Sequence, residues 1–155
     1  MPGSPFDTFG SPKDPHERYL VEIQSLVVAV FKEAEGLQSE REALELEEGG
    51  RDDRIALPGP FSQGTFVLRE GEADDLDLFR WYEKSRDADH LTSSRRSGSV
   101  ILVDGLGRER MRWKFRTAVI TTWGGPSQPP RAGRPFAIEL LEIAHEGLEP
   151  VLHLR

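Results

Sequence analysis

The sequence contains no cysteine among its 155 residues, so neither a disulfide nor a thiolate metal site can form. It also lacks a long apolar run, because apolar stretches such as Ser25–Phe31 are far too short to cross a bilayer. The first residues have neither the basic segment nor the apolar run of a secretory signal. We therefore expect cytoplasmic synthesis without a signal peptide, and no membrane insertion by the chain itself.

Positive charge is also scarce, with 20 basic against 27 acidic side chains and a formal net charge of −7. A surface of that sign repels phosphate, which argues against specific nucleic-acid binding. The remaining composition is that of an ordinary soluble chain, with 37% hydrophobic and 30% charged residues. The 15 glycines and 11 prolines predict many chain reversals, as expected where several short strands follow one another.

The chain divides into two regions of different composition. Residues 1–15 are rich in proline, glycine and serine and have almost no hydrophobic periodicity, which predicts a flexible arm. Residues 16–155 carry the hydrophobic segments and are long enough to bury one core. We expect them to form a single domain.

Residue patterns in this domain predict roughly seven strands and one helix, a mainly β fold. The predicted strands are Tyr19–Leu26, Val27–Phe31, Glu40–Glu48, Gly64–Glu70, Ser99–Val103, Arg108–Thr122 and Phe136–Glu146. The clearest pair is a hairpin that turns at Asp104–Gly107. Polar or Pro/Gly-rich breaks are expected at 49–53, 57–60, 93–99 and 123–133, and a short tail is expected after Glu146.

Two strands carry informative alternation. In the strand after the hairpin turn, the apolar residues are Met111, Trp113 and Phe115, and the basic residues between them are Arg112, Lys114 and Arg116. One face should therefore be buried and the other wet. In the last strand the apolar face changes after Leu140, from Phe136 and Ile138 to Leu141 and Ile143. That change predicts either burial on both sides or a bulge.

The predicted helix follows an acidic segment. Asp74 is the expected N-cap, Asp75 and Asp77 place negative charge in the first turn, and Lys84 and Arg86 lie near the end. The helix presents an apolar face, which should lie on the sheet. The residues of that face are Leu78, Trp81, Tyr82 and Ser85, flanked by Leu76 and Phe79.

Two segments have the composition of a ligand site but not its spacing. Glu142 and His145 suggest a metal motif, yet such motifs place their ligands on one face of a helix. Here the segment is predicted to be a strand, where these side chains point to opposite faces. Gly105 and Gly107 could belong to a phosphate loop, but the third glycine and the following helix are missing. We therefore predict neither a metal site nor a phosphate site.

No residue stands in a catalytic context either. No serine occupies a nucleophile-elbow motif, and the acidic runs lack the spacing of a calcium loop. The basic row at Arg112, Lys114 and Arg116 could bind an anion, but it is better explained as the wet face of a strand. We predict no catalytic residue, no cofactor-binding residue and no metal ligand, and hence no cofactor and no enzymatic activity.

Several segments, taken together and in order, resemble the phage tail-tube family. The strongest is Phe136–Glu149, which is similar to that family's closing strand and its His-Glu-Gly-Leu ending. The others are Leu46–Gly50 with Leu57–Gly59, Val67–Gly71, Gly98–Asp104, Trp113–Phe115 and Trp123–Pro126. The resemblance covers about Tyr19–Leu148. Members of this family also form the inner tube of contractile injection systems, and they are related in fold to type VI secretion ring proteins.

This resemblance implies both a fold and an assembly. The fold would be two packed antiparallel sheets, as a sandwich or barrel, with one flanking α-helix. Subunits would join their sheets into a ring-wide β-barrel, and homohexameric rings would stack into a tube with a lumen. The implied partners are further copies of the chain, sheath and baseplate proteins, and a luminal cargo, all within an injection particle.

Three alternatives to a main tube subunit stay open. The chain could form the baseplate-proximal ring that initiates the tube, or a type VI-like secreted hexameric ring that also serves as an effector chaperone. A third alternative, a small ligand-binding or hydrolytic β-barrel, requires an apolar pocket with convergent polar groups. The sequence offers no such cluster, so a structural tube subunit is the favoured hypothesis.

Overall fold

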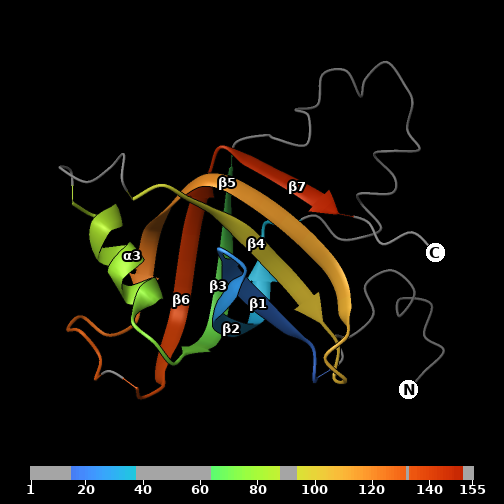
Figure 1. Cartoon of the computed structure of the whole chain (residues 1–155), viewed down its shortest axis with the longest axis horizontal. Coiled ribbons are helices and arrows are strands. Elements are labelled where there is room, and N and C mark those ends of the chain that lie inside the picture. The colour runs from blue at the N-terminus through green and yellow to red at the C-terminus, as the bar shows by residue number, and fades with distance from the viewer. Residues whose placement is uncertain (1–14, 38–63, 88–93, 132, 152–155) are drawn as a thin grey trace.

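The structure is a computed structural model, and it describes residues 15–37, 64–87, 94–131 and 133–151. These residues form a mainly β domain with one helix, as predicted (Figure 1). The elements are β1 (Arg18–Ile23), β2 (Leu26–Glu35), β3 (Gly64–Ala73), α3 (Asp77–Ser85), β4 (Arg96–Val103), β5 (Glu109–Gly124), β6 (Phe136–His145) and β7 (Gly147–Val151). Within these residues, no helix is long and apolar enough to span a bilayer.

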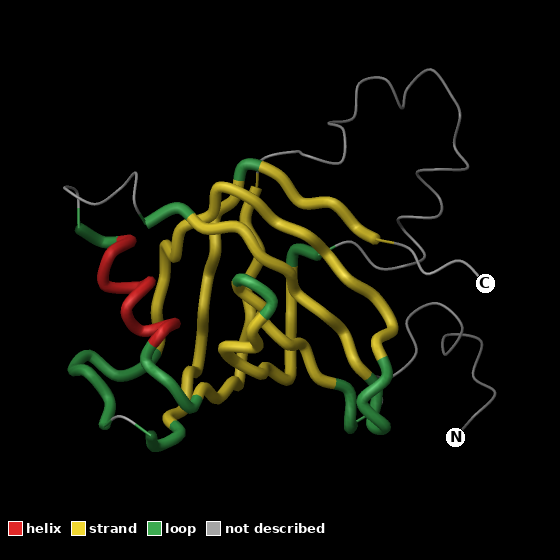
Figure 2. The backbone as a smooth tube through the Cα atoms, viewed as in Figure 1, coloured by secondary structure: helices red, strands yellow, loops and turns green. Residues whose placement is uncertain are grey.

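All the strands belong to one antiparallel sheet that closes on itself. Its order is β4-β1-β2-β3-β6-β5, and β5 returns to pair with β4. The two packed layers expected from the sequence are therefore opposite walls of one six-stranded barrel (Figure 2). Closure pairs the backbone groups that an open sheet would leave at its edges. The strand β7 follows β6 after Glu146 and pairs with Arg112–Arg116 in the first part of β5.

The first part of β5 alternates as predicted. Met111, Trp113 and Phe115 are buried in the barrel, whereas Lys114 is exposed on the outer wall. The alternation then shifts, because Ala118 is the next buried residue. Between the two halves Thr117 adopts a positive φ of 54°, and the register with β4 slips between Arg96 and Gly98. A β-bulge at Thr117 therefore turns the second half of the strand over.

The change of face predicted in the last strand is confirmed, and two neighbouring strands share it. Ile138 and Leu141 are both buried, and they pair with Gly71 and Leu68 of β3. In both β3 and β6, two successive residues point outward between residues that point inward. The pairing of the strands continues without a register shift. On β3 the second of these is Glu70, whose φ is 57°. We call the line along which the strands β2, β3 and β6 change their inward face the crease.

An aromatic ring fills the inner side of the crease. Phe31 pairs with Gly71, and its fully buried ring occupies the space where a Cβ on Gly71 would lie. Glycine is required at this position because any side chain would overlap the ring. Leu140 faces outward and is half-buried in the single chain, and β6 pairs with β3 without a register shift, so the parity change reflects the crease and neither of the two predicted causes, burial of both faces or a bulge.

The helix α3 covers one end of the barrel and contacts both halves of β5. Trp81 stacks on Phe115 with ring centroids 6.3 Å apart, and Tyr82 stacks on Trp123 at 4.7 Å. Ser85 is buried, and its Oγ accepts a hydrogen bond of 3.1 Å from the backbone N–H of Ile120. The predicted helix face is therefore the one that packs on the sheet.

Several predicted boundaries were wrong, and four of the differences are informative. The first reversal falls at Gln24–Ser25, both with positive φ, so Leu26 begins β2 and does not end β1. The helix begins at Asp77 without a side-chain cap on Leu76, and Asp75 rather than Asp74 accepts the Asp77 backbone N–H, at 2.9 Å. Part of the turn predicted at 93–99 belongs to β4, and β7 occupies part of the predicted tail.

Some predictions lie outside the described residues. They are the strand predicted at 40–48, the breaks at 49–53 and 57–60, and residues 1–14 of the predicted arm. With β7 in place of the predicted strand 40–48, seven strands are present in the described part of the chain.

Candidate assembly surfaces

Glu142 and His145 lie on opposite faces of β6, as the strand pattern predicts. Glu142 faces outward, and its Oε1 accepts hydrogen bonds from the hydroxyls of Thr121 and Thr122 at 2.9 and 2.7 Å. These hydroxyls hold the pKa of the Glu142 carboxyl below its usual range. His145 is buried against Phe66 with ring centroids 5.8 Å apart, and burial lowers the pKa of its imidazole. No cluster of three potential metal ligands occurs in the described part of the chain.

The Asp104–Gly107 turn is organised around one carboxylate. Asp104 Oδ1 accepts the backbone N–H groups of Leu106 and Arg108, and Oδ2 accepts Nε–H of Arg108, each at 2.9 Å. The Arg108 backbone N–H is the main reason that the pKa of Asp104 lies below its usual range. An anion would find these donors occupied, so the turn is no phosphate loop. It holds Leu106 at its tip with 78% of its surface exposed.

The basic row on β5 is partly neutralised. Arg112 contacts Glu22 of β1 at 2.9 Å and Glu109 at 3.0 Å, and these partners raise the pKa of its guanidinium. Lys114 lies opposite Ser99 of β4 and Glu149 of β7 in the pairing. The row therefore forms part of a mixed-charge outer wall, and it does not converge on one anion site.

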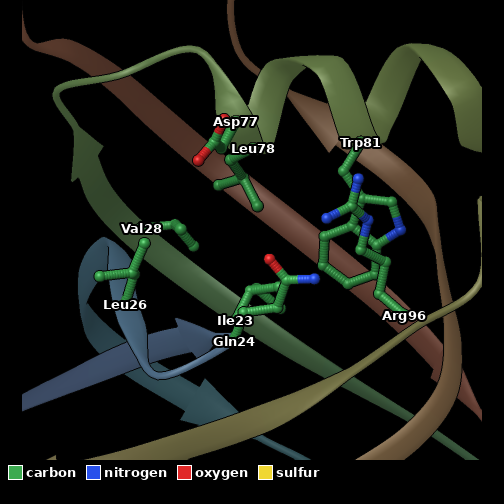
Figure 3. A pocket seen from close by; sticks show the side chains of 8 residues that line it. All are labelled: Ile23, Gln24, Leu26, Val28, Asp77, Leu78, Trp81 and Arg96. Carbon is green, nitrogen blue, oxygen red and sulfur yellow. The ribbon is translucent and has the colours of Figure 1, made fainter.

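Two hollows stand out on the described part of the surface, and neither resembles a ligand pocket. The first, of about 30 Å³, has room for little more than one water molecule (Figure 3). It separates the β1–β2 turn from the start of α3, and its lining residues are Ile23, Gln24, Leu26, Val28, Asp77, Leu78, Trp81 and Arg96. The second, of about 330 Å³, is open and shallow. It lies over the crease among charged residues that include Arg18, Lys32, Glu70 and Glu72.

Three large hydrophobic side chains are exposed in the described residues, and all three stand at or beside hairpin turns. They are Leu26 at 64%, Val27 at 47% and Leu106 at 78%. Sequence reasoning missed them as surface features, because Leu26 and Val27 were assigned to strands without a face. Leu106 offered a usable signal, since an apolar residue between two turn glycines has no nearby core to enter.

The interior of the barrel holds a core of buried apolar side chains. Its aromatic residues contact one another in the core, for example Phe66 with Phe115 at 5.7 Å between centroids. These features define the class of fold: a closed, mainly β barrel with a core of apolar side chains.

Comparisons with known proteins identify the family within this class. A family model described as T4-like virus tail tube protein gp19 matches residues 15–149, far more than half of the chain. The chain therefore belongs to the T4-like virus tail tube family, a family of structural tube proteins, as the sequence resemblance indicated.

A solved structure has the same fold. It is a chain titled "Cryo-EM Structure of an Extracellular Contractile Injection System, PVC sheath-tube complex in extended state". The match has a TM-score of 0.51 at 12% sequence identity, and it covers 99% of this chain and 100% of that chain. Among curated proteins, no significant match is found.

Proposed function

We propose that this chain is the structural subunit of the inner tube of a contractile phage-tail-like injection system. Membership of the tail tube family carries the proposal, and the fold shared with a sheath-tube complex supports it. In this role the chain forms homohexameric rings that stack into a tube, with sheath and baseplate proteins as partners and a lumen for cargo. The chain acts by assembly and force transmission, without catalysis.

The barrel has the physical properties that a tube wall requires. Its interior is filled by apolar side chains, so the subunit is stiff and has no compressible pocket. Among the described strands, β7 pairs only with β5, which leaves its other backbone edge for further pairing. Pairing of such edges between neighbouring subunits would continue the sheet around a ring and remove the exposed edge.

Imaging of the purified chain tests this function. The chain is expressed alone and together with sheath and baseplate proteins, and native mass spectrometry and negative-stain microscopy record its state. Hexameric rings or tubes are expected. Rings that never stack, even with all partners, would identify a tube-initiating ring instead. A strictly monomeric chain under every condition would falsify the proposal.

We also propose that residues 1–15 are dispensable for folding and contribute to contacts between rings. Their composition supports no core of their own. Removal of these residues should leave the melting temperature of the subunit nearly unchanged and alter tube length or yield. A large loss of subunit stability would contradict this assignment.

A further inference from the structure

We propose that the Leu106 turn of one copy packs over the hollow beside α3 of a copy in the next ring. The Leu106 turn is the segment Asp104–Gly107, and the α3 hollow is the first hollow described above. This inference rests on the proposed tube function, and it names the contact by which one ring recognises the next. The two surfaces are complementary in position, in polarity and in charge.

Their positions suit a head-to-tail contact. In the β1–β4 pairing Ile23 lies opposite Gly98 and Arg18 lies opposite Val103, so the two strands run side by side over their whole length. The α3 hollow adjoins the Ile23 end, and the Leu106 turn follows Val103 at the other end (Figure 1). A copy displaced along these strands brings its turn to the hollow of its neighbour. Such a contact joins two different surfaces, so it can repeat without limit.

We assign this contact to the stacking of rings, and not to contacts within one ring, because the two kinds of contact involve different parts of the strands. Subunits that continue one sheet around a ring meet along strand edges. The turns at the strand ends then lie at the rims of the ring, where the next ring sits. The Leu106 turn and the α3 hollow belong to opposite rims, as polar stacking requires.

The apolar parts of the two surfaces also fit. Leu106 is exposed on a turn that Asp104 fixes by three hydrogen bonds, so little freedom is lost when it binds. The floor of the α3 hollow is formed by Leu78 and by Trp81, whose indole N–H already donates to the Ser94 carbonyl at 2.6 Å. The branched end of Leu106 can pack over the mouth of this hollow, beside the exposed Leu26.

Charges border both surfaces in a complementary arrangement. Asp74, Asp75 and Asp77 are exposed at the start of α3, and Asp77 lines the hollow itself. On the other surface Arg108 has 71% of its side chain exposed and uses its Nε to hold Asp104. Its two Nη groups can therefore donate to a carboxylate of the neighbouring copy, a geometry that guanidinium favours. Arg96 lines the hollow as well and limits the excess of negative charge there.

Disulfide trapping tests the contact directly, because the chain has no cysteine of its own. The double variant Leu26→Cys with Leu106→Cys places one thiol on each surface, and both wild-type residues are exposed, so folding should be unaffected. The two sites lie at opposite ends of the barrel, which prevents a bond within one chain. After mild oxidation of assembled tubes, a non-reducing gel should show a ladder of linked chains that extends beyond six subunits.

Matched variants make the outcomes distinct. Leu106→Cys with Lys84→Cys moves the second thiol to an exposed position at the far end of α3 and should give no ladder. Each single-cysteine variant reports contacts between identical surfaces. Tubes without a ladder, an equal ladder in the control pair, or a ladder that stops at six would each overturn this contact and leave the tube function intact. The absence of any ring or tube from the wild-type chain would instead overturn the proposed function, and this contact with it.

Discussion

Two walls of the barrel reverse the face of their strands, and they do so by different means. In β5 a bulge at Thr117 adds one residue and slips the register with β4. In the opposite wall β2, β3 and β6 turn over together at the crease, and their pairing is unbroken. A bulge is local to one strand, whereas a crease requires the same change in three strands. The same change of hydrophobic alternation in a sequence can therefore arise from two different structural causes.

The largest expected effect comes from the regular half of β5, before the bulge. Trp113→Asp removes a buried ring and places a charge in the core, which should cost about 4 kcal/mol or more of unfolding free energy. That loss is comparable with the total stability of a small domain. Its neighbour Lys114 is exposed, so Lys114→Glu should fold normally and affect only assembly or its salt dependence. Urea denaturation followed by circular dichroism checks both, and a stable Trp113→Asp variant would contradict the register.

The next effect tests the crease. Gly71→Ala places a methyl group in the space of the buried Phe31 ring, and the displaced ring should cost about 1–3 kcal/mol. Gly64→Ala is the matched control on the same strand, because its nearest contact, with His145, would be an ordinary 3.6 Å. Thermal unfolding of the two variants gives the comparison. Equal stability of both would show that the crease does not depend on the Phe31–Gly71 contact.

A smaller change in stability, of opposite sign, is expected at the two residues where strands change face, Thr117 and Glu70. Thr117 and Glu70 both adopt positive φ, a conformation that is unfavourable for residues with a Cβ. Thr117→Gly and Glu70→Gly should therefore stabilise the domain, by up to about 1 kcal/mol each. Val119→Gly, in the extended part of β5, should destabilise it instead. A loss of stability in Thr117→Gly equal to that in Val119→Gly would indicate that the Thr117 side chain matters more than its backbone.

The smallest expected effect is on the pH dependence of stability, and it concerns only the wall that contains the crease. His145 is buried on β6, and burial lowers the pKa of its imidazole in the folded state. The unfolded chain therefore binds a proton first as the pH falls below about 6.5, and the stability contributed by neutral His145 is lost toward acid pH. His145→Phe should flatten the decline in stability between about pH 7 and 5. An unaltered slope in His145→Phe would refute the assignment.

Much of the fold followed from alternation, because alternation reports which face of a strand is buried. The hairpin at Asp104–Gly107, the buried row around Trp113, the packing face of the helix and the parity change near Leu140 were all predicted and are present. Closure of the sheet was not predictable in the same way. The β4–β5 pairing depends on where strands meet in space, and a local pattern carries no information about that.

The missed details have local physical causes. Gln24 and Ser25 form a turn with positive φ at both residues, where the sequence gives no glycine as a signal. The strand β7, in the segment expected to be a tail, contains Pro150, and it lies at a sheet edge where proline is tolerated. For the assembly surfaces, the family followed from the sequence, but the exposed leucines became surface features only once the turns were placed.

The return of β5 to β4 has a mechanical consequence. In an open sheet, a pull on an edge strand breaks its hydrogen bonds one after another, as a zipper opens. Here the edge that would be peeled first is bonded along Arg96–Val103, so a load along the strands acts on the whole ladder in shear. Many bonds must then break at once, and the rate of forced unfolding stays low under load. The closed ring of six strands therefore has no free strand edge at which tearing can begin.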